Sequence, residues 1–196
     1  MNDIKKYDEK NVISPKSFLS FEVMTSGADP KKNSILAIGY VYNNPEKEIL
    51  VQKEDRCRLE KGKELDLSYI KENEIDIKGI KILSKSAKDI AEIFIDSVAD
   101  TKPDIMIGYD ITPKIAFIYN VLSDEYRKKM LETFPLVLDL KIVLKNKKTR
   151  KIKIKELEEH KALSGAWDYL LMFYDLYTNK EKDLILPFYD IKEISE

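Results

Sequence analysis

The stretch Phe18-Leu19-Ser20-Phe21-Glu22-Val23-Met24 is apolar at most of its positions. A short run of this kind, bounded by turn residues, is typical of a central β-strand that is covered on both faces. Turn-forming residues follow at 25–30, and two further strand-like runs come soon after, at 35–42 and from residue 48 onward. Three strands so close together in the sequence indicate an antiparallel meander.

Beyond residue 85 the pattern changes. Apolar residues recur at helical spacing in 86–99, a short buried strand follows at 105–108, and a second helix is expected through 115–118. Another strand is expected at 135–139, followed by a strongly apolar helix at 162–177. Helices and strands that alternate in this way indicate an α/β fold. We therefore predict a mixed sheet, a three-strand antiparallel meander plus parallel strands, flanked by helices.

The chain length suits one main domain. Its 196 residues can bury one sizeable core and leave short appendages. We predict a flexible N-terminal arm at 1–16, the domain at 17–180 and a C-terminal extension at 181–196. The apolar part of that extension, 184–189, is expected to fold back onto the domain; the alternative is a strand that docks a partner.

Composition excludes several classes of protein. With 34 Lys+Arg and 35 Asp+Glu, the overall charge does not point to nucleic acid, so such a partner needs a local basic patch. One cysteine, Cys57, excludes an intramolecular disulfide, and one histidine, His160, excludes a metal site with two or three histidines of this chain. Arg56 and Arg58 flank Cys57, and neighbouring cations can lower the pKa of a thiol, although a single unpaired cysteine in an intracellular chain is usually incidental.

The sequence also bears on cellular location. Its first ten residues lack the apolar core of a signal peptide. No run approaches the roughly 18 uncharged apolar residues that a membrane helix needs. We therefore expect an intracellular protein, cytoplasmic or nuclear, without a membrane partner.

Three stretches carry the functional information: FEVMTSG at 21–27, IGYDITPKIAFI at 107–118 and HKALSGA at 160–166. Taken in this order, they resemble the three motifs of the DEDDh 3′–5′ exonucleases, which read F-D-x-E-T-T-G, G-H-N-x-x-F-D-x-x-F and H-x-A-x-x-D-A. The resemblance covers roughly residues 18–178. It implies a ribonuclease-H-like fold for the predicted mixed sheet.

The resemblance also implies where the chemistry of that family would lie. Four carboxylates there hold two divalent metal ions, which activate water, and a histidine serves as general base. The four acid positions fall here on Glu22, Met24, Lys114 and Gly165, and the histidine position falls on His160. Met24 and Gly165 offer no hard oxygen ligand, and Lys114 adds a positive charge. We therefore expect no metal pair, no cofactor and no hydrolysis, with Glu22 and His160 as remnants.

Opposite charges at two of these positions suggest a replacement for the metal: an ion pair between Glu22 and Lys114 would neutralise the site. The alternative is a displaced Mg²⁺ or Mn²⁺ site formed by Glu22, Asp110 and Asp168. Otherwise Asp110 is a turn residue or helix cap, and Asp168 is a solvated helical position. His160 also has two interpretations: it is a retained general base or, as we expect in the absence of metal-bound water, a leftover or hydrogen-bonding residue at a helix start.

A basic segment at 141–155 carries eight lysines and arginines and no acid. Its end, 150–155, alternates basic and apolar residues, as a strand with one basic face would. Such side chains can bind the phosphates of DNA or RNA with strong salt dependence. The predicted contacts are Lys145, Lys147, Lys148, Arg150, Lys151 and Lys153. The alternative is a solvated loop balanced by the acids at 156–159.

Together these observations predict a catalytically inactive, exonuclease-like protein. It would act as a nucleic-acid-binding accessory or as a scaffold for a protein partner. One alternative is an active metal-dependent 3′–5′ exonuclease with a displaced metal site. The other is a structural protein without a nucleic-acid role.

Overall fold

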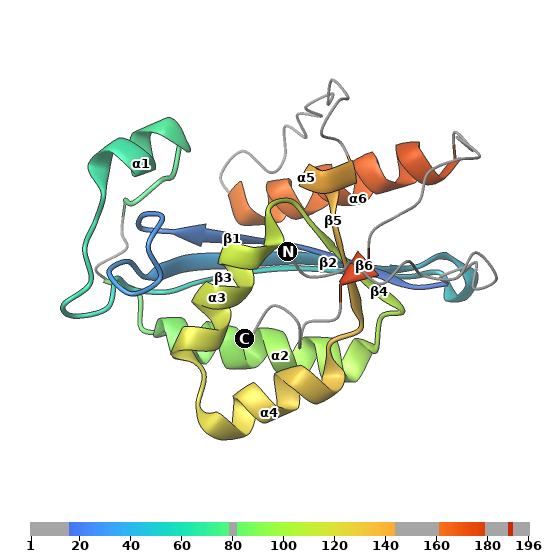
Figure 1. Ribbon diagram of the computed structural model, residues 1–196, viewed down its shortest axis with the longest axis horizontal. Coiled ribbons are helices and arrows are strands. Elements are labelled where there is room, and N and C mark those ends of the chain that lie inside the picture. The colour runs from blue at the N-terminus through green and yellow to red at the C-terminus, as the bar shows by residue number, and fades with distance from the viewer. Residues whose placement is uncertain (1–15, 79–81, 144–160, 179–187, 190–196) are drawn as a thin grey trace, which may run out of the picture.

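A mixed β-sheet crosses the molecule and carries helices on both faces (Figure 1). The computed structural model describes residues 16–78, 82–143, 161–178 and 188–189. Six strands lie in the order β3-β2-β1-β4-β5-β6. The predicted α/β class, with an antiparallel meander that continues into parallel strands, is confirmed.

The meander consists of β1 (Phe18–Thr25), β2 (Ile35–Asn44) and β3 (Ile49–Arg56), which are antiparallel neighbours. A 3-10 turn, η1 (Pro45–Lys47), joins β2 to β3. β1 lies inside the sheet between β2 and β4. Its apolar residues are buried because both of its faces are covered, as its sequence predicts.

The parallel part consists of β4 (Ile105–Gly108), which pairs with β1, and β5 (Leu136–Asp139), which pairs with β4. The short strand β6 (Phe188–Tyr189) pairs antiparallel with β5. These two residues of the C-terminal segment therefore lie against the domain, as expected. The rest of 181–196 and residues 1–15 lie outside the described residues.

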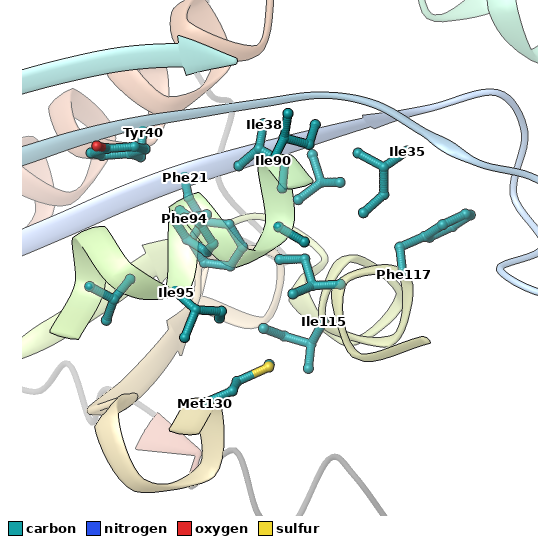
Figure 2. Close-up of a cluster of buried hydrophobic side chains, with 14 of the residues drawn as sticks. Phe21, Ile35, Ile38, Tyr40, Ile90, Phe94, Ile95, Ile115, Phe117 and Met130 are labelled. Atoms are coloured by element: carbon teal, nitrogen blue, oxygen red, sulfur yellow. The ribbon is translucent and has the colours of Figure 1, made fainter. Parts of the chain in front are cut away.

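The helices form two layers. One layer contains α2 (Ala87–Thr101), α3 (Ile111–Val121) and α4 (Asp124–Thr133). They share a buried cluster with the sheet, centred on aromatic and aliphatic side chains such as Phe21 and Phe94 (Figure 2). The other layer is α6 (Lys161–Thr178), whose Leu170 and Phe173 pack on β1 and β2.

Three short or polar elements differ from the sequence expectation. Helix α4 was not predicted because Met130 is its only buried residue, so it shows no apolar stripe. The helix α1 (Leu67–Glu72) lies in the charged stretch after β3, where no periodicity marks it. Helix α5 (Leu140–Val143) follows β5 directly and is a single turn.

The N-terminal end of α6 lies very close to the sheet. A Cβ atom at Gly39 in β2 would overlap the backbone of this helix, so glycine is required there. The Ser20 hydroxyl donates to the Ala166 carbonyl at 2.6 Å, and Glu54 accepts a hydrogen bond from the Leu163 N–H at 2.9 Å. The first turns of α6 are therefore fixed against the antiparallel part of the sheet, with contacts to β1, β2 and β3.

The arginines that flank Cys57 do not activate its thiol. Cys57 is buried, and its Sγ contacts the Ile35 carbonyl at 3.1 Å as a hydrogen-bond donor. Burial, reinforced by the charge of Glu60, raises the pKa of the Cys57 thiol to about 12 and outweighs the opposing effect of Arg58. The flanking cations therefore do not lower the pKa of this thiol, because the side chain is inside the protein.

Within the described ranges, we find no helix with the length and apolar character needed to cross a membrane.

Candidate functional site

A cleft of about 720 Å³ opens where β1, the beginning of α3 and the first half of α6 meet. The residues at the four acid positions of the exonuclease motifs, Glu22, Met24, Lys114 and Gly165, all line it. The three sequence stretches therefore converge in space, as the resemblance implies. His160 lies outside the described residues.

Glu22 and Lys114 form an ion pair in this cleft. The Lys114 Nζ lies 2.7 Å from the Glu22 Oε1, and the two side chains are only 14% and 16% exposed. The same Oε1 accepts a hydrogen bond from the Val23 N–H at 2.7 Å. The ion pair expected from the sequence is present, and its low exposure protects it from screening by solvent.

Tyr169, on α6, completes a three-residue cluster. Its hydroxyl donates to the Glu22 Oε2 and accepts a hydrogen bond from the Lys114 Nζ at 3.3 Å. The ammonium also lies 4.8 Å from the centroid of the Tyr169 ring. Burial, followed by the negative charge of Glu22, raises the pKa of the Tyr169 hydroxyl well above its usual value, so the hydroxyl stays protonated.

Sequence reasoning missed Tyr169. It lies four residues after Gly165, and residues at this spacing share one face of a helix. This spacing could have indicated Tyr169 as a site residue, because it places the tyrosine hydroxyl one helical turn beyond the last motif position.

The other two altered positions have structural roles. Met24 packs against the apolar cluster of Leu36, Ile70 and Ile75 beneath α1. A Cβ at Gly165 would lie 3.0 Å from the Glu22 Cγ and 3.2 Å from its Oε2. The Glu22 side chain therefore occupies the space next to the fourth acid position.

The acids of the displaced metal site, Glu22, Asp110 and Asp168, all line the same cleft. The Asp110 carboxylate pairs with Lys141 at 2.7 Å. Asp168 is half-buried at the cleft wall and is not the solvated residue that was expected. Among the residues that the structure describes, no three His, Cys, Asp or Glu side chains are grouped to hold a metal ion.

Asp139, rather than Asp110, caps helix α3. Asp110 occupies the N-cap position in a left-handed conformation with φ 54°, but its side chain makes no capping hydrogen bond. The Asp139 carboxylate accepts hydrogen bonds from the N–H groups of Asp110, Ile111 and Lys141 at 2.9, 3.0 and 2.9 Å. This one buried side chain fixes the beginning of both α3 and α5.

All six predicted nucleic-acid contacts lie outside the described residues: Lys145, Lys147, Lys148, Arg150, Lys151 and Lys153. Lys141, the first basic residue of the segment, is described and pairs with Asp110 at the cleft. The basic segment therefore begins beside the cleft.

The ion pair can be tested by a double-mutant cycle with Glu22→Gln and Lys114→Met. Each single change leaves a poorly solvated charge, so each is expected to lower the free energy of unfolding by roughly 2 kcal/mol. The double variant should be more stable than the sum of the two effects predicts, by about 1 kcal/mol in urea titrations. Strict additivity would show that the pair contributes nothing.

The alkaline behaviour of Tyr169 gives a second test. Above about pH 10 the unfolded chain ionises this tyrosine while the folded chain does not, so stability falls as pH rises. Tyr169→Phe is expected to reduce that fall in urea titrations between pH 9 and 11. Absorbance at 295 nm, with the unfolded chain as control, should show one fewer late-titrating tyrosine in the variant. Loss of a normally titrating tyrosine instead would contradict the assignment.

Comparison with known proteins bears on the fold. No protein-family model and no curated protein sequence matches the chain. Among solved structures, E. coli exonuclease I in complex with a dT13 oligonucleotide matches with a TM-score of 0.63 and 10% identity, over 85% of this chain and 42% of that chain. A product-bound exonuclease I matches with a TM-score of 0.62 and 11% identity, over 86% and 45% of the two chains.

Exonuclease I from Methylocaldum szegediense gives a similar result, with a TM-score of 0.62 and 12% identity over 86% and 41% of the two chains. The present chain spans less than half the length of the chain in each of these three structures. Identities this low show a common fold and nothing finer. The chain has an exonuclease-like, ribonuclease-H-like α/β fold.

Proposed function

We propose that this chain is a catalytically inactive, exonuclease-like protein that acts by binding, as a nucleic-acid-binding accessory or a scaffold. The observation that carries the proposal is the ion pair between Lys114 and Glu22 inside the cleft. It places a cation and its counter-ion where the exonuclease motifs would place metal ligands. The cleft is present, but the side chains at the motif positions offer different ligand chemistry.

The donor set of the cleft does not fit two divalent ions. Mg²⁺ needs oxygen ligands, and both oxygens of Glu22 are already bound by Lys114, Tyr169 and the Val23 N–H. A dication 4–5 Å from the Lys114 ammonium would be repelled by roughly 7 kcal/mol at an effective dielectric constant near 20. Two-metal hydrolysis of a phosphodiester therefore lacks its ligands.

Two features support nucleic acid as the bound partner. The fold matches exonuclease I, one structure of which holds a dT13 oligonucleotide. The basic segment 141–155 begins at the cleft, where Lys141 pairs with Asp110. A cation-rich sequence whose first lysine lies at a cleft of this fold suits a single-stranded ligand.

A nuclease assay tests the inactive assignment. Labelled single-stranded DNA and RNA, incubated with Mg²⁺ or Mn²⁺, should not be shortened by the purified chain. The matched control is Glu22→Ala, which should give the same result. Shortening that a chelator stops and that Glu22→Ala abolishes would establish the active alternative with a displaced metal site.

A binding assay tests the nucleic-acid role. Replacement of Lys147, Lys148, Lys151 and Lys153 by glutamine should weaken binding of a single strand. The slope of log K against log salt should drop by about 0.7 for each phosphate contact that is lost. The control replaces four exposed lysines elsewhere, at 31, 47, 88 and 128, and should leave both quantities unchanged. Absence of binding by the parent chain at low salt would favour the structural alternative.

A further inference from the structure

Three side chains form a column at the wall of the cleft. The Lys114 ammonium lies 4.8 Å from the centroid of the Tyr169 ring, and the Tyr169 ring stacks on Tyr109 with centroids 6.1 Å apart and planes 21° from parallel. The Tyr169 hydroxyl is bound by Glu22. The central ring of the column is therefore held at both its face and its hydroxyl.

Tyr109 is the open end of this column. It lines the cleft and is 37% exposed, although it is a large aromatic residue directly after the buried strand β4. Its backbone position is also fixed, since Asp139 binds the N–H of the next residue, Asp110. An aromatic ring held in this way loses little conformational freedom when a ligand stacks on it.

The charges around Tyr109 are compensated within the protein. Glu22 is paired with Lys114, and Asp110 is paired with Lys141. Each of these lysines is thus paired with a carboxylate, which weakens its attraction for a phosphate. The ring of Tyr109 is exposed beside the two pairs, and stacking on an aromatic ring suits a planar, aromatic ligand.

We propose that Tyr109 is a stacking platform on which the cleft takes one unpaired nucleobase without a metal ion. This inference rests on the proposed function, because a single strand bound through the basic segment is the source of the base. The base makes the stacking contact at Tyr109, whose ring lines the cleft. Stacking of this kind tolerates any of the four bases.

The test uses single-stranded oligonucleotides that carry the fluorescent base 2-aminopurine at the 5′ or the 3′ end, in the presence of EDTA. Stacking on Tyr109 should quench the fluorescence of the parent complex. Tyr109→Leu keeps an apolar side chain but removes the ring, so it should abolish the quenching and raise Kd about 10-fold or more. Tyr109→Phe keeps the ring and should behave like the parent.

A strand that ends in an abasic site is the matched ligand control, and its Kd should be the same for the parent and Tyr109→Leu. Free 2-aminopurine riboside can be tested in the same way. Quenching of its fluorescence by the parent protein would also support the base site at Tyr109 and would show that the site binds free nucleosides. Thermal unfolding of each variant shows that it is folded before it is compared.

Two outcomes would overturn the inference, and they are distinguishable. If the parent binds strands but Tyr109→Leu keeps its quenching and Kd, the platform is wrong while the proposed function stands. If the parent binds no strand at low salt, the nucleic-acid role fails and the inference fails with it.

Discussion

The ammonium of Lys114 and the carboxylate of Glu22 lie 2.7 Å apart at the inner wall of the cleft, largely shielded from water. Two charges in such a place are stable only if their remaining hydrogen-bonding groups also find partners. The Val23 N–H and the Tyr169 hydroxyl supply those partners for the carboxylate. The arrangement on this side of the cleft depends on this pair.

The sheet and the helices bring the members of this cluster together from distant parts of the chain. Glu22 comes from the central strand, Lys114 from α3 and Tyr169 from α6. Helix α6 approaches closely enough because Gly39 has no side chain, and α3 starts where Asp139 binds its first N–H groups. The packing of these elements thus brings together three side chains that are far apart in the sequence.

Much of the fold was predictable from the sequence, and the reason is burial. Strand β1 and helices α2 and α6 bury residues at regular intervals, so their apolar patterns are strong. Helix α4 buries one residue, and it leaves no such pattern. The ion pair of Glu22 and Lys114 was also predictable, because motif positions fix which residues share the cleft.

Other parts of the site were not predictable. The role of Asp139 depends on N–H groups of three residues, which no side-chain pattern records. Tyr109, just after a strand, stacks on Tyr169, which lies 60 positions later in the middle of a helix. The chain has eleven tyrosines, and nothing in the sequence indicates that these two are in contact. Such features emerge only when the elements are packed.

Gly165 has a consequence for the order in which this site can change. The Glu22 side chain lies against the glycine, so a Cβ at 165 would require Glu22 to shift by a few tenths of an ångström, and a carboxylate there would add a second negative charge at the same place. Glu22 is held by Lys114 and Tyr169, so that shift would weaken both contacts. The effect of a substitution at 165 therefore depends on the state of the Glu22–Lys114 pair, and the positions are epistatic.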